Sequence, residues 1–260
     1  TLTSRGCNWA YLKSRCEMTK SLIKILSVLL LCSTTNAFAD EFADNLGLTL
    51  LPVEPSTQVN AAPSHSKPPL VIFLSGDGGW ATLDKAVGGI LQQQGWPVVG
   101  WSSLKYYWKQ KDPKDVTQDT LAIIDKYQAE FGTQKVILIG YSFGAEVIPF
   151  VLNEMPARYR KNILGAVLLS PSQSSDFEIH VSEMVTSDNQ SARYLTLPEV
   201  NKQTSVPMLC LYGKEDDAPL HLCPAVKQPN VTVMELSGGH SFDDDYDKVV
   251  KLIKGWLKSS

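Results

Sequence analysis

The stretch Val136-Ile137-Leu138-Ile139-Gly140-Tyr141-Ser142-Phe143-Gly144 decides the fold class of this 260-residue chain. Four consecutive apolar residues predict a buried strand, and the sequence from Phe143 onward is compatible with a helix. Between them lies a Gly-x-Ser-x-Gly motif, whose glycines let a strand and a helix approach closely around a sharp turn. Such a turn holds the hydroxyl of Ser142 free above the edge of a sheet. This context predicts a serine hydrolase, against the alternative of an ordinary serine in a glycine-flanked turn.

A nucleophilic serine needs a base to take its proton, and histidine is the usual base. The chain has four histidines. His65 lies in a Pro/Ser-rich stretch, His180 precedes the candidate acids, and His221 follows those acids by only a few residues. His240 comes after the strand-like run 231–236, within Gly238-Gly239-His240-Ser241. We therefore predict that His240 is the catalytic base.

The third member of the predicted triad is an acid that orients the histidine. A strand-like run over 206–213 is followed by Glu215, Asp216 and Asp217, on the loop where such an acid belongs. The spacing from Gly213 favours Asp216. Asp217 and Glu215 remain alternatives.

Acyl transfer also requires backbone donors for the developing negative charge. The apolar run 70–75 predicts the first core strand, and it leads into Gly76-Asp77-Gly78-Gly79-Trp80. We expect the oxyanion donors to be the backbone N–H groups of Asp77 and Phe143. The same glycines lack the Lys-Ser/Thr ending of a phosphate-binding loop and the spacing of a dinucleotide fingerprint, so no cofactor is predicted.

The N-terminal region has the pattern of an export signal. Residues 18–39 contain Lys20 and Lys24, an apolar segment over 25–32, and Ala37-Phe38-Ala39. This pattern predicts an exported protein with a signal peptide cleaved near Ala39, and residues 1–17 as an upstream segment. The apolar segment is too short to remain as a transmembrane helix. Lipidation of Cys32 is an alternative.

Two cysteines, Cys210 and Cys223, remain after the predicted cleavage site. An exported protein meets an oxidising compartment, which favours a disulfide between them. Because the pair flanks the acidic loop, the bridge would brace the triad acid.

The charge of the chain disfavours nucleic acid as a partner. The full chain has 24 Lys and Arg residues against 27 Asp and Glu, a net charge of −3. Residues 1–39 hold five of the basic residues and one of the acidic ones, so 19 against 26 remain, a net charge of −7. A polyanion gains little from such a surface.

Strand and helix patterns alternate through residues 70–260, which predicts one α/β domain with the α/β-hydrolase fold: a mostly parallel central sheet flanked by helices. Residues 40–69 are predicted to form a short strand near 48–51 and a Pro-rich linker. The expected core strands are 70–75, 97–101, 135–140, 164–170, 207–212 and 231–236, and the expected helices are 81–94, 114–131, 143–154 and 242–257. The interval 171–206 leaves room for a small lid or none, and Phe177–Val181 within it reads as an extra strand. Asp243, Asp244 and Asp245 suit the first turn of the last helix, and no metal site is predicted.

Several motifs together resemble one protein family, over about residues 68–258. They are Gly76-Asp77-Gly78-Gly79-Trp80 with Asp84, Gly95-Trp96 with Ser103-Leu104-Lys105-Tyr106-Tyr107-Trp108, Gly140 to Glu146, Asp176-Phe177-Glu178, and Gly238-Gly239-His240 with Asp245-Tyr246-Asp247. The chain resembles the bacterial virulence protein VirJ and the C-terminal domain of AcvB, which are periplasmic α/β-hydrolase-like proteins.

The resemblance implies hydrolysis of aminoacylated phosphatidylglycerol, in the lysyl or alanyl form, at a membrane surface. The ammonium group of that substrate would favour a nearby carboxylate, so Asp77, Asp84 and Glu146, together with Trp80, are the candidate substrate-binding residues. The segment 105–111 combines aromatic and basic residues and could rest on lipid headgroups. The alternatives are another serine esterase, thioesterase or peptidase, or a non-catalytic periplasmic accessory protein of virulence or secretion.

Overall fold

The computed structural model describes residues 41–52, 67–179, 193–216 and 221–259. The chain divides into two compact units, Thr1–Asn45 and Leu46–Ser260. In the first unit the described residues, 41–45, are helical. The predicted upstream segment and signal peptide lie outside the described residues, as does most of the predicted linker. The second unit holds the sheet and the candidate site.

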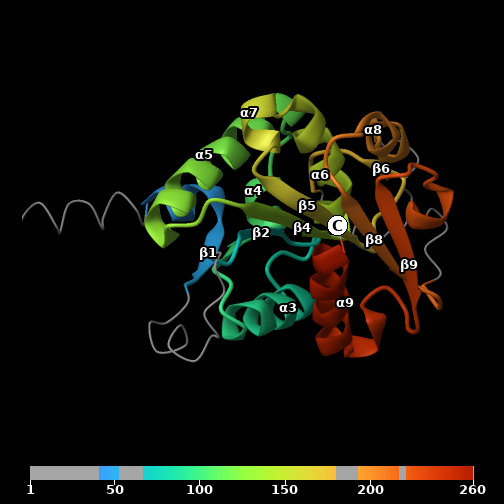
Figure 1. Cartoon of the computed structure of the whole chain (residues 1–260). Coiled ribbons are helices and arrows are strands. Elements are labelled where there is room, and N and C mark those ends of the chain that lie inside the picture. The colour runs from blue at the N-terminus through green and yellow to red at the C-terminus, as the bar shows by residue number, and fades with distance from the viewer. Residues whose placement is uncertain (1–40, 53–66, 180–192, 217–220, 260) are drawn as a thin grey trace, which may run out of the picture. The chain divides into compact units, whose positions relative to one another are not determined.

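A seven-stranded sheet forms the centre of the second unit (Figure 1). The strand order is β1-β3-β2-β4-β5-β8-β9, and every pair is parallel except β1 with β3. The bounds are β1 Leu48–Leu51, β2 Leu70–Leu74, β3 Val98–Trp101, β4 Val136–Tyr141, β5 Ile163–Leu169, β8 Met208–Gly213 and β9 Val231–Leu236. Because these strands run parallel, the loops that follow them meet at one edge of the sheet.

Helices cover both faces of the sheet (Figure 1). On one face α3 (Thr82–Gln93) packs beside α9 (Tyr246–Ser259), and on the other α6 (Phe143–Glu154) packs between α5 (Pro113–Phe131) and α8 (Thr196–Lys202). The shorter helices are α4 (Ser103–Tyr106) and α7 (Ala157–Arg160). None of the described helices is both long and apolar enough to cross a membrane.

The central strands are buried along their length. All five residues of β2 are buried, and so are Val136 to Gly140 of β4. A strand covered on both faces needs apolar residues at consecutive positions, which explains why these strands are continuous apolar runs rather than alternating patterns. The α/β-hydrolase fold predicted from the sequence is confirmed, and each of the six expected core strands lies within two residues of an observed one.

Two predicted elements differ from the structure in part. The last helix does not run through 242–257: a 3₁₀ turn, η3 (Phe242–Asp244), precedes α9, and its three residues have φ of 59°, 49° and 62°. The extra strand over Phe177–Val181 is not formed at 177–179, where Phe177 has φ 57°, and its remaining residues lie outside the described chain. The strands of this region are instead β6 (Ser174–Ser175) and β7 (Tyr194–Leu195), which pair with each other. Left-handed backbone at non-glycine residues breaks both predicted elements.

The predicted disulfide is confirmed. Cys210 of β8 and Cys223 of η2 (Cys223–Ala225) are joined, with their Cα atoms 5.6 Å apart. Both residues are buried. The bridge therefore ties the segment that follows β8 back onto β8 itself.

Candidate active site

Ser142 occupies a strained turn between β4 and α6. Its backbone has φ 50° and ψ −119°, and its N–H donates to the carbonyl of Leu169 at 2.8 Å. A Cβ added at Gly144 would lie 2.3 Å from the carbonyl oxygen of Leu74, and one added at Gly140 would lie 2.5 Å from the N atom of Ala145. Only glycine fits at either place, since backbone atoms would be displaced. The two motif glycines therefore permit the close contact that the turn requires.

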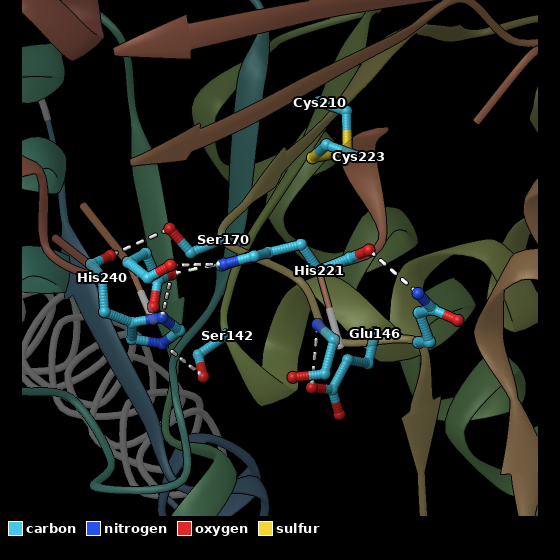
Figure 2. Close-up of polar contacts among 10 residues, drawn as sticks. Ser142, Glu146, Ser170, Cys210, His221, Cys223 and His240 are labelled. Atoms are coloured by element: carbon cyan, nitrogen blue, oxygen red, sulfur yellow. Dashed lines mark hydrogen bonds and ion pairs between the residues drawn. A yellow bond between two sulfur atoms is a disulfide. The ribbon is translucent and has the colours of Figure 1, made fainter. Parts of the chain in front are cut away.

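His240 lies between Ser142 and Asp216 (Figure 2). Its Nε2 is 3.0 Å from Oγ of Ser142, and its Nδ1 is 2.8 Å from Oδ2 of Asp216. A carboxylate only accepts hydrogen bonds, so Nδ1 carries the proton and Nε2 is free to take one from the serine. The side chain of Asp216 is 5% exposed and that of His240 is 38% exposed. The geometry is that of a nucleophile, a base and an orienting acid.

The candidate acids Glu215 and Asp216 bind different partners. Glu215 binds the backbone of the histidine loop instead of the imidazole: its carboxylate accepts from the N–H of Gly238, and its own N–H donates to the carbonyl of Gly238 at 3.0 Å. Asp217 lies outside the described residues, as do His65 and His180. Asp216 is the candidate acid that the structure brings to His240.

Backbone contacts fix the loop that carries His240. The hydroxyl of Ser170 donates to the carbonyl of His240 at 2.9 Å, and Ser170 itself has φ 47° at the end of β5. A Cβ added at Gly213 would lie 2.1 Å from the carbonyl oxygen of Gly239, so the acid and histidine loops touch through their backbones. The role of Ser170 is not predicted from the sequence, because the sequence shows only a polar residue directly after an apolar strand.

The glycine-rich loop after β2 lies beside the nucleophile. A Cβ added at Gly76 would lie 3.6 Å from Cβ of Ser142. The side chain of Asp77 is exposed and accepts from the N–H of Gly78 at 2.8 Å, which stabilises the turn. Within the described chain, neither the N–H of Asp77 nor that of Phe143 donates to another group. Both donors are available to a ligand near Ser142.

Two of the four candidate substrate-binding residues lie in the scaffold. The ring of Trp80 packs edge-on against Phe73, 5.4 Å between centroids, and beneath Gly100, where an added Cβ would approach the ring to 2.6 Å. Asp84 is buried and caps α3 by accepting from the N–H of Ala81 at 3.1 Å. Burial raises the pKa of Asp84 to about 6, although the N–H groups of Ala81 and Gly76 act against the rise. Asp84 thus stabilises the N-terminus of α3.

Glu146 is buried one helical turn after Ser142 (Figure 2). Its carboxylate accepts from the N–H of Ser172 at 3.3 Å. Desolvation raises the pKa of Glu146 to about 7, and the hydrogen bond from Ser172 limits the rise. This carboxylate therefore changes its charge near neutral pH.

The described residues contain no group of three or more His, Cys, Asp or Glu side chains arranged to hold a metal ion.

The strained turn yields a stability prediction. We expect Ser142→Gly to be more stable than Ser142→Ala by about 1 kcal/mol, because glycine adopts the observed φ and ψ without steric cost. The difference corresponds to a Tm about 2 to 4 °C higher, measurable by calorimetry. The matched control is Ala122→Gly on the exposed face of α5, where the same loss of a Cβ should destabilise by about 0.5 to 1 kcal/mol. Equal Tm values for the two Ser142 variants would contradict the strain.

The buried Glu146 yields a pH prediction. Its pKa of about 7 in the folded protein exceeds the ordinary 4.5, so the folded state holds more protons between these values. The contribution of Glu146 to stability is complete below pH 4.5 and is lost as the pH rises through about 7. Between pH 5 and 8 we expect the parent to lose about 1 to 3 kcal/mol more unfolding free energy than Glu146→Gln, measured by urea denaturation.

The matched control for this pH series is Glu154→Gln, on the exposed surface of the same helix. It should follow the parent at every pH. A Glu146→Gln variant with the same pH dependence as the parent would refute the proposed titration.

Solved structures of other proteins share the fold of this chain. The chain resembles solved structures of Est1E from Butyrivibrio proteoclasticus (17% identity, TM-score 0.54, 82% of this chain and 92% of that one) and of an α/β-hydrolase enzyme from a lagoon sediment metagenome in Morocco (16%, 0.56, 75% and 92%). A third is the proline iminopeptidase of Mycobacterium smegmatis (12%, 0.54, 82% and 94%). These likenesses show the α/β-hydrolase fold. No curated protein matches the chain.

A sequence profile described as "Bacterial virulence protein (VirJ)" matches residues 69–260, which include the whole candidate site. The family resemblance inferred from the motifs is thereby confirmed. The chain belongs to the VirJ family of bacterial virulence proteins.

Proposed function

We propose that this protein is a periplasmic serine hydrolase that cleaves the aminoacyl ester of aminoacylated phosphatidylglycerol. The main support for hydrolase activity is the position of His240, which lies within hydrogen-bond distance of both Ser142 and the buried Asp216. The substrate class rests on the resemblance described above. The disulfide between Cys210 and Cys223 supports an oxidising compartment, as the proposed export requires.

In the proposed reaction Ser142 attacks the ester carbonyl while His240 takes the hydroxyl proton at Nε2. The carbonyl oxygen becomes negative and is stabilised by the N–H groups of Asp77 and Phe143. His240 then gives its proton to the departing glycerol oxygen, which leaves an aminoacyl ester on Ser142. Water, activated by His240, releases the amino acid and restores the serine. Asp216 remains ionised throughout and stabilises the charged imidazole.

The carboxylates near Ser142 differ in how well they suit a substrate ammonium group. Asp77 is exposed on the loop beside the nucleophile, where a substrate can reach it. Asp84 and Glu146 are buried and accept from backbone N–H groups. In this proposal Asp77 pairs with the ammonium group directly, and the two buried carboxylates contribute at longer range.

The proposed surface for the lipid is the segment 105–109, next to the turn that carries Ser142. Tyr107, at the end of α4, packs against Phe143 with ring centroids 4.9 Å apart. The next residue, Trp108, is 62% exposed, and Lys105 and Lys109 on either side are exposed as well. An exposed indole between two lysines suits a layer of anionic headgroups. Lys111 takes a different role, with its Nζ over the ring of Tyr106 at 4.3 Å.

The first experiment measures amino-acid release from lysyl- and alanyl-phosphatidylglycerol vesicles by mass spectrometry. We expect release by the parent and a rate at least about 1,000-fold lower for Ser142→Ala, since removal of a nucleophile abolishes covalent catalysis. Parallel labelling with a fluorophosphonate probe reports whether Ser142 is activated. Labelling without release would indicate an active serine hydrolase whose substrate is another ester, a thioester or a peptide. If the parent shows no labelling and no release, a non-catalytic accessory protein would be favoured.

A second experiment tests the lipid surface. The double variant Lys105→Gln/Lys109→Gln should bind phosphatidylglycerol vesicles about 30-fold more weakly, because each lysine near an anionic surface contributes about 1 kcal/mol. Trp108→Ala should weaken binding too, and all these variants should hydrolyse a soluble ester at the parent rate. Lys251→Gln/Lys258→Gln on exposed positions of α9 removes the same charge and serves as the control. Equal binding by both double variants would disprove docking through 105–109.

A further inference from the structure

A second histidine contacts the candidate acid. Nε2 of His221 is 2.6 Å from the backbone carbonyl oxygen of Asp216, and its Nδ1 is 3.8 Å from Oδ2 of the same residue. Oδ2 is also the atom that binds His240. Figure 2 shows the imidazole of His221 directed toward the acid that His240 binds.

The contact fixes the proton of His221. A carbonyl oxygen only accepts hydrogen bonds, so Nε2 of His221 must be the donor. At 3.8 Å the Nδ1 atom is beyond hydrogen-bond distance from the carboxylate. His221 therefore forms its hydrogen bond with the peptide carbonyl of Asp216, whereas His240 binds the carboxylate.

His221 is itself held from two sides. Its carbonyl accepts from Nε2 of Gln173 at 3.1 Å, and it forms a β-bridge with Ser172, in the segment that follows β5. The N–H of Leu222 donates to the carbonyl of Pro171 at 3.1 Å, and the next residue, Cys223, is bonded to Cys210 in β8. The imidazole thus extends from a backbone that is anchored to two neighbouring strands of the sheet.

Asp216 needs such a support. It lies three residues beyond the end of β8, where its N–H donates to the carbonyl of Gly213 at 3.3 Å. Its peptide orientation decides where Oδ2 points, and an error of about 1 Å in a catalytic constellation can cost about 100-fold in rate. A neutral hydrogen bond contributes only about 0.5 to 1.5 kcal/mol to stability. The effect of His221 on rate should therefore be larger than its effect on folding.

We propose that His221 is a positioning residue: by donating from Nε2 to the carbonyl of Asp216, it holds the acid so that Oδ2 faces His240, and the Cys210–Cys223 disulfide keeps His221 in place. The inference rests on the proposed function of Ser142, His240 and Asp216. It assigns His221 no contact with the substrate.

The test compares two replacements of His221 in an assay with a soluble nitrophenyl ester. His221→Phe keeps a ring but has no donor, and we expect kcat to fall about 10- to 100-fold with KM unchanged. In His221→Gln the side-chain amide takes the place of Nε2, and we expect it to recover most of that loss. In an Asp216→Asn background, His221→Phe should cause little further loss, because the two residues act through one contact.

Three results would overturn the proposal: full kcat in His221→Phe, an equal loss in the phenylalanine and glutamine variants, or the same fold-loss in the Asp216→Asn background. A parent protein that neither reacts with the fluorophosphonate probe nor cleaves the ester would instead refute the proposed function itself.

A measurement on the parent keeps the inference testable even if His221→Phe does not fold. In protein labelled with ¹⁵N-histidine, NMR distinguishes the two neutral tautomers of each imidazole. We expect His221 with its proton on Nε2 and His240 with its proton on Nδ1. A proton on Nδ1 alone of His221 would exclude the hydrogen bond to Asp216 and with it the positioning role.

Discussion

The close approach of Gly144 to the end of β2 is the constraint on which the rest of the candidate site depends. The helix α6 can begin directly above the sheet only because no side chain separates Gly144 from the carbonyls of Leu74 and Ser75. The helix start leaves the N–H of Phe143 free, and the same turn puts Ser142 in a strained conformation with its hydroxyl toward His240. One backbone contact thus positions both a nucleophile and a donor.

Parallel strand order brings the remaining groups to the same edge. The strands β2, β4, β5, β8 and β9 each end in a loop that contributes a residue: Gly76, Ser142, Ser170, Asp216 and His240. These loops support one another through backbone atoms, as in the contact between Gly213 and Gly239 and the bond from Ser170 to the carbonyl of His240. A constellation held by backbone contacts depends less on side-chain entropy than one held by long side chains.

The order of motifs along the chain is enough to predict the fold and the strand–turn–helix arrangement around Ser142, because each depends on a local pattern at the end of a predicted strand. The same pattern leaves Asp216, Asp217 and Glu215 as candidate acids. The contacts of Ser170 and His221 depend on which strands are neighbours, and that order is not written in local sequence. His221 lies only a few residues after the candidate acids, which argues against a role as the base. In the fold, this short separation brings its imidazole to the peptide carbonyl of Asp216. Trp80 belongs to the glycine-rich motif beside Ser142, which predicts a role in the site. Its ring instead packs on the sheet, where Gly88 and Gly100 leave space for it. The predicted helix at 242–257 and strand at 177–181 were wrong where Phe242 and Phe177 take left-handed backbone, which apolar residues rarely adopt.

The charges around Ser142 bear on the proposed substrate. Burial is the main cause that raises the pKa of Tyr141, next to the nucleophile, and the charged groups that raise it further include Asp84, Asp216 and Asp77. In the proposed reaction this negative environment opposes an anionic group at the reaction centre, so the oxyanion depends on the N–H donors. An aminoacyl group brings its ammonium into that environment, while the phosphate of the same lipid is separated from it by the glycerol. In the proposed function Lys105 and Lys109, on the segment whose Tyr107 packs against Phe143, would provide the opposite charge for that phosphate. The proposed substrate, with a cation at its acyl end and an anion beyond its leaving group, would suit this distribution of charge.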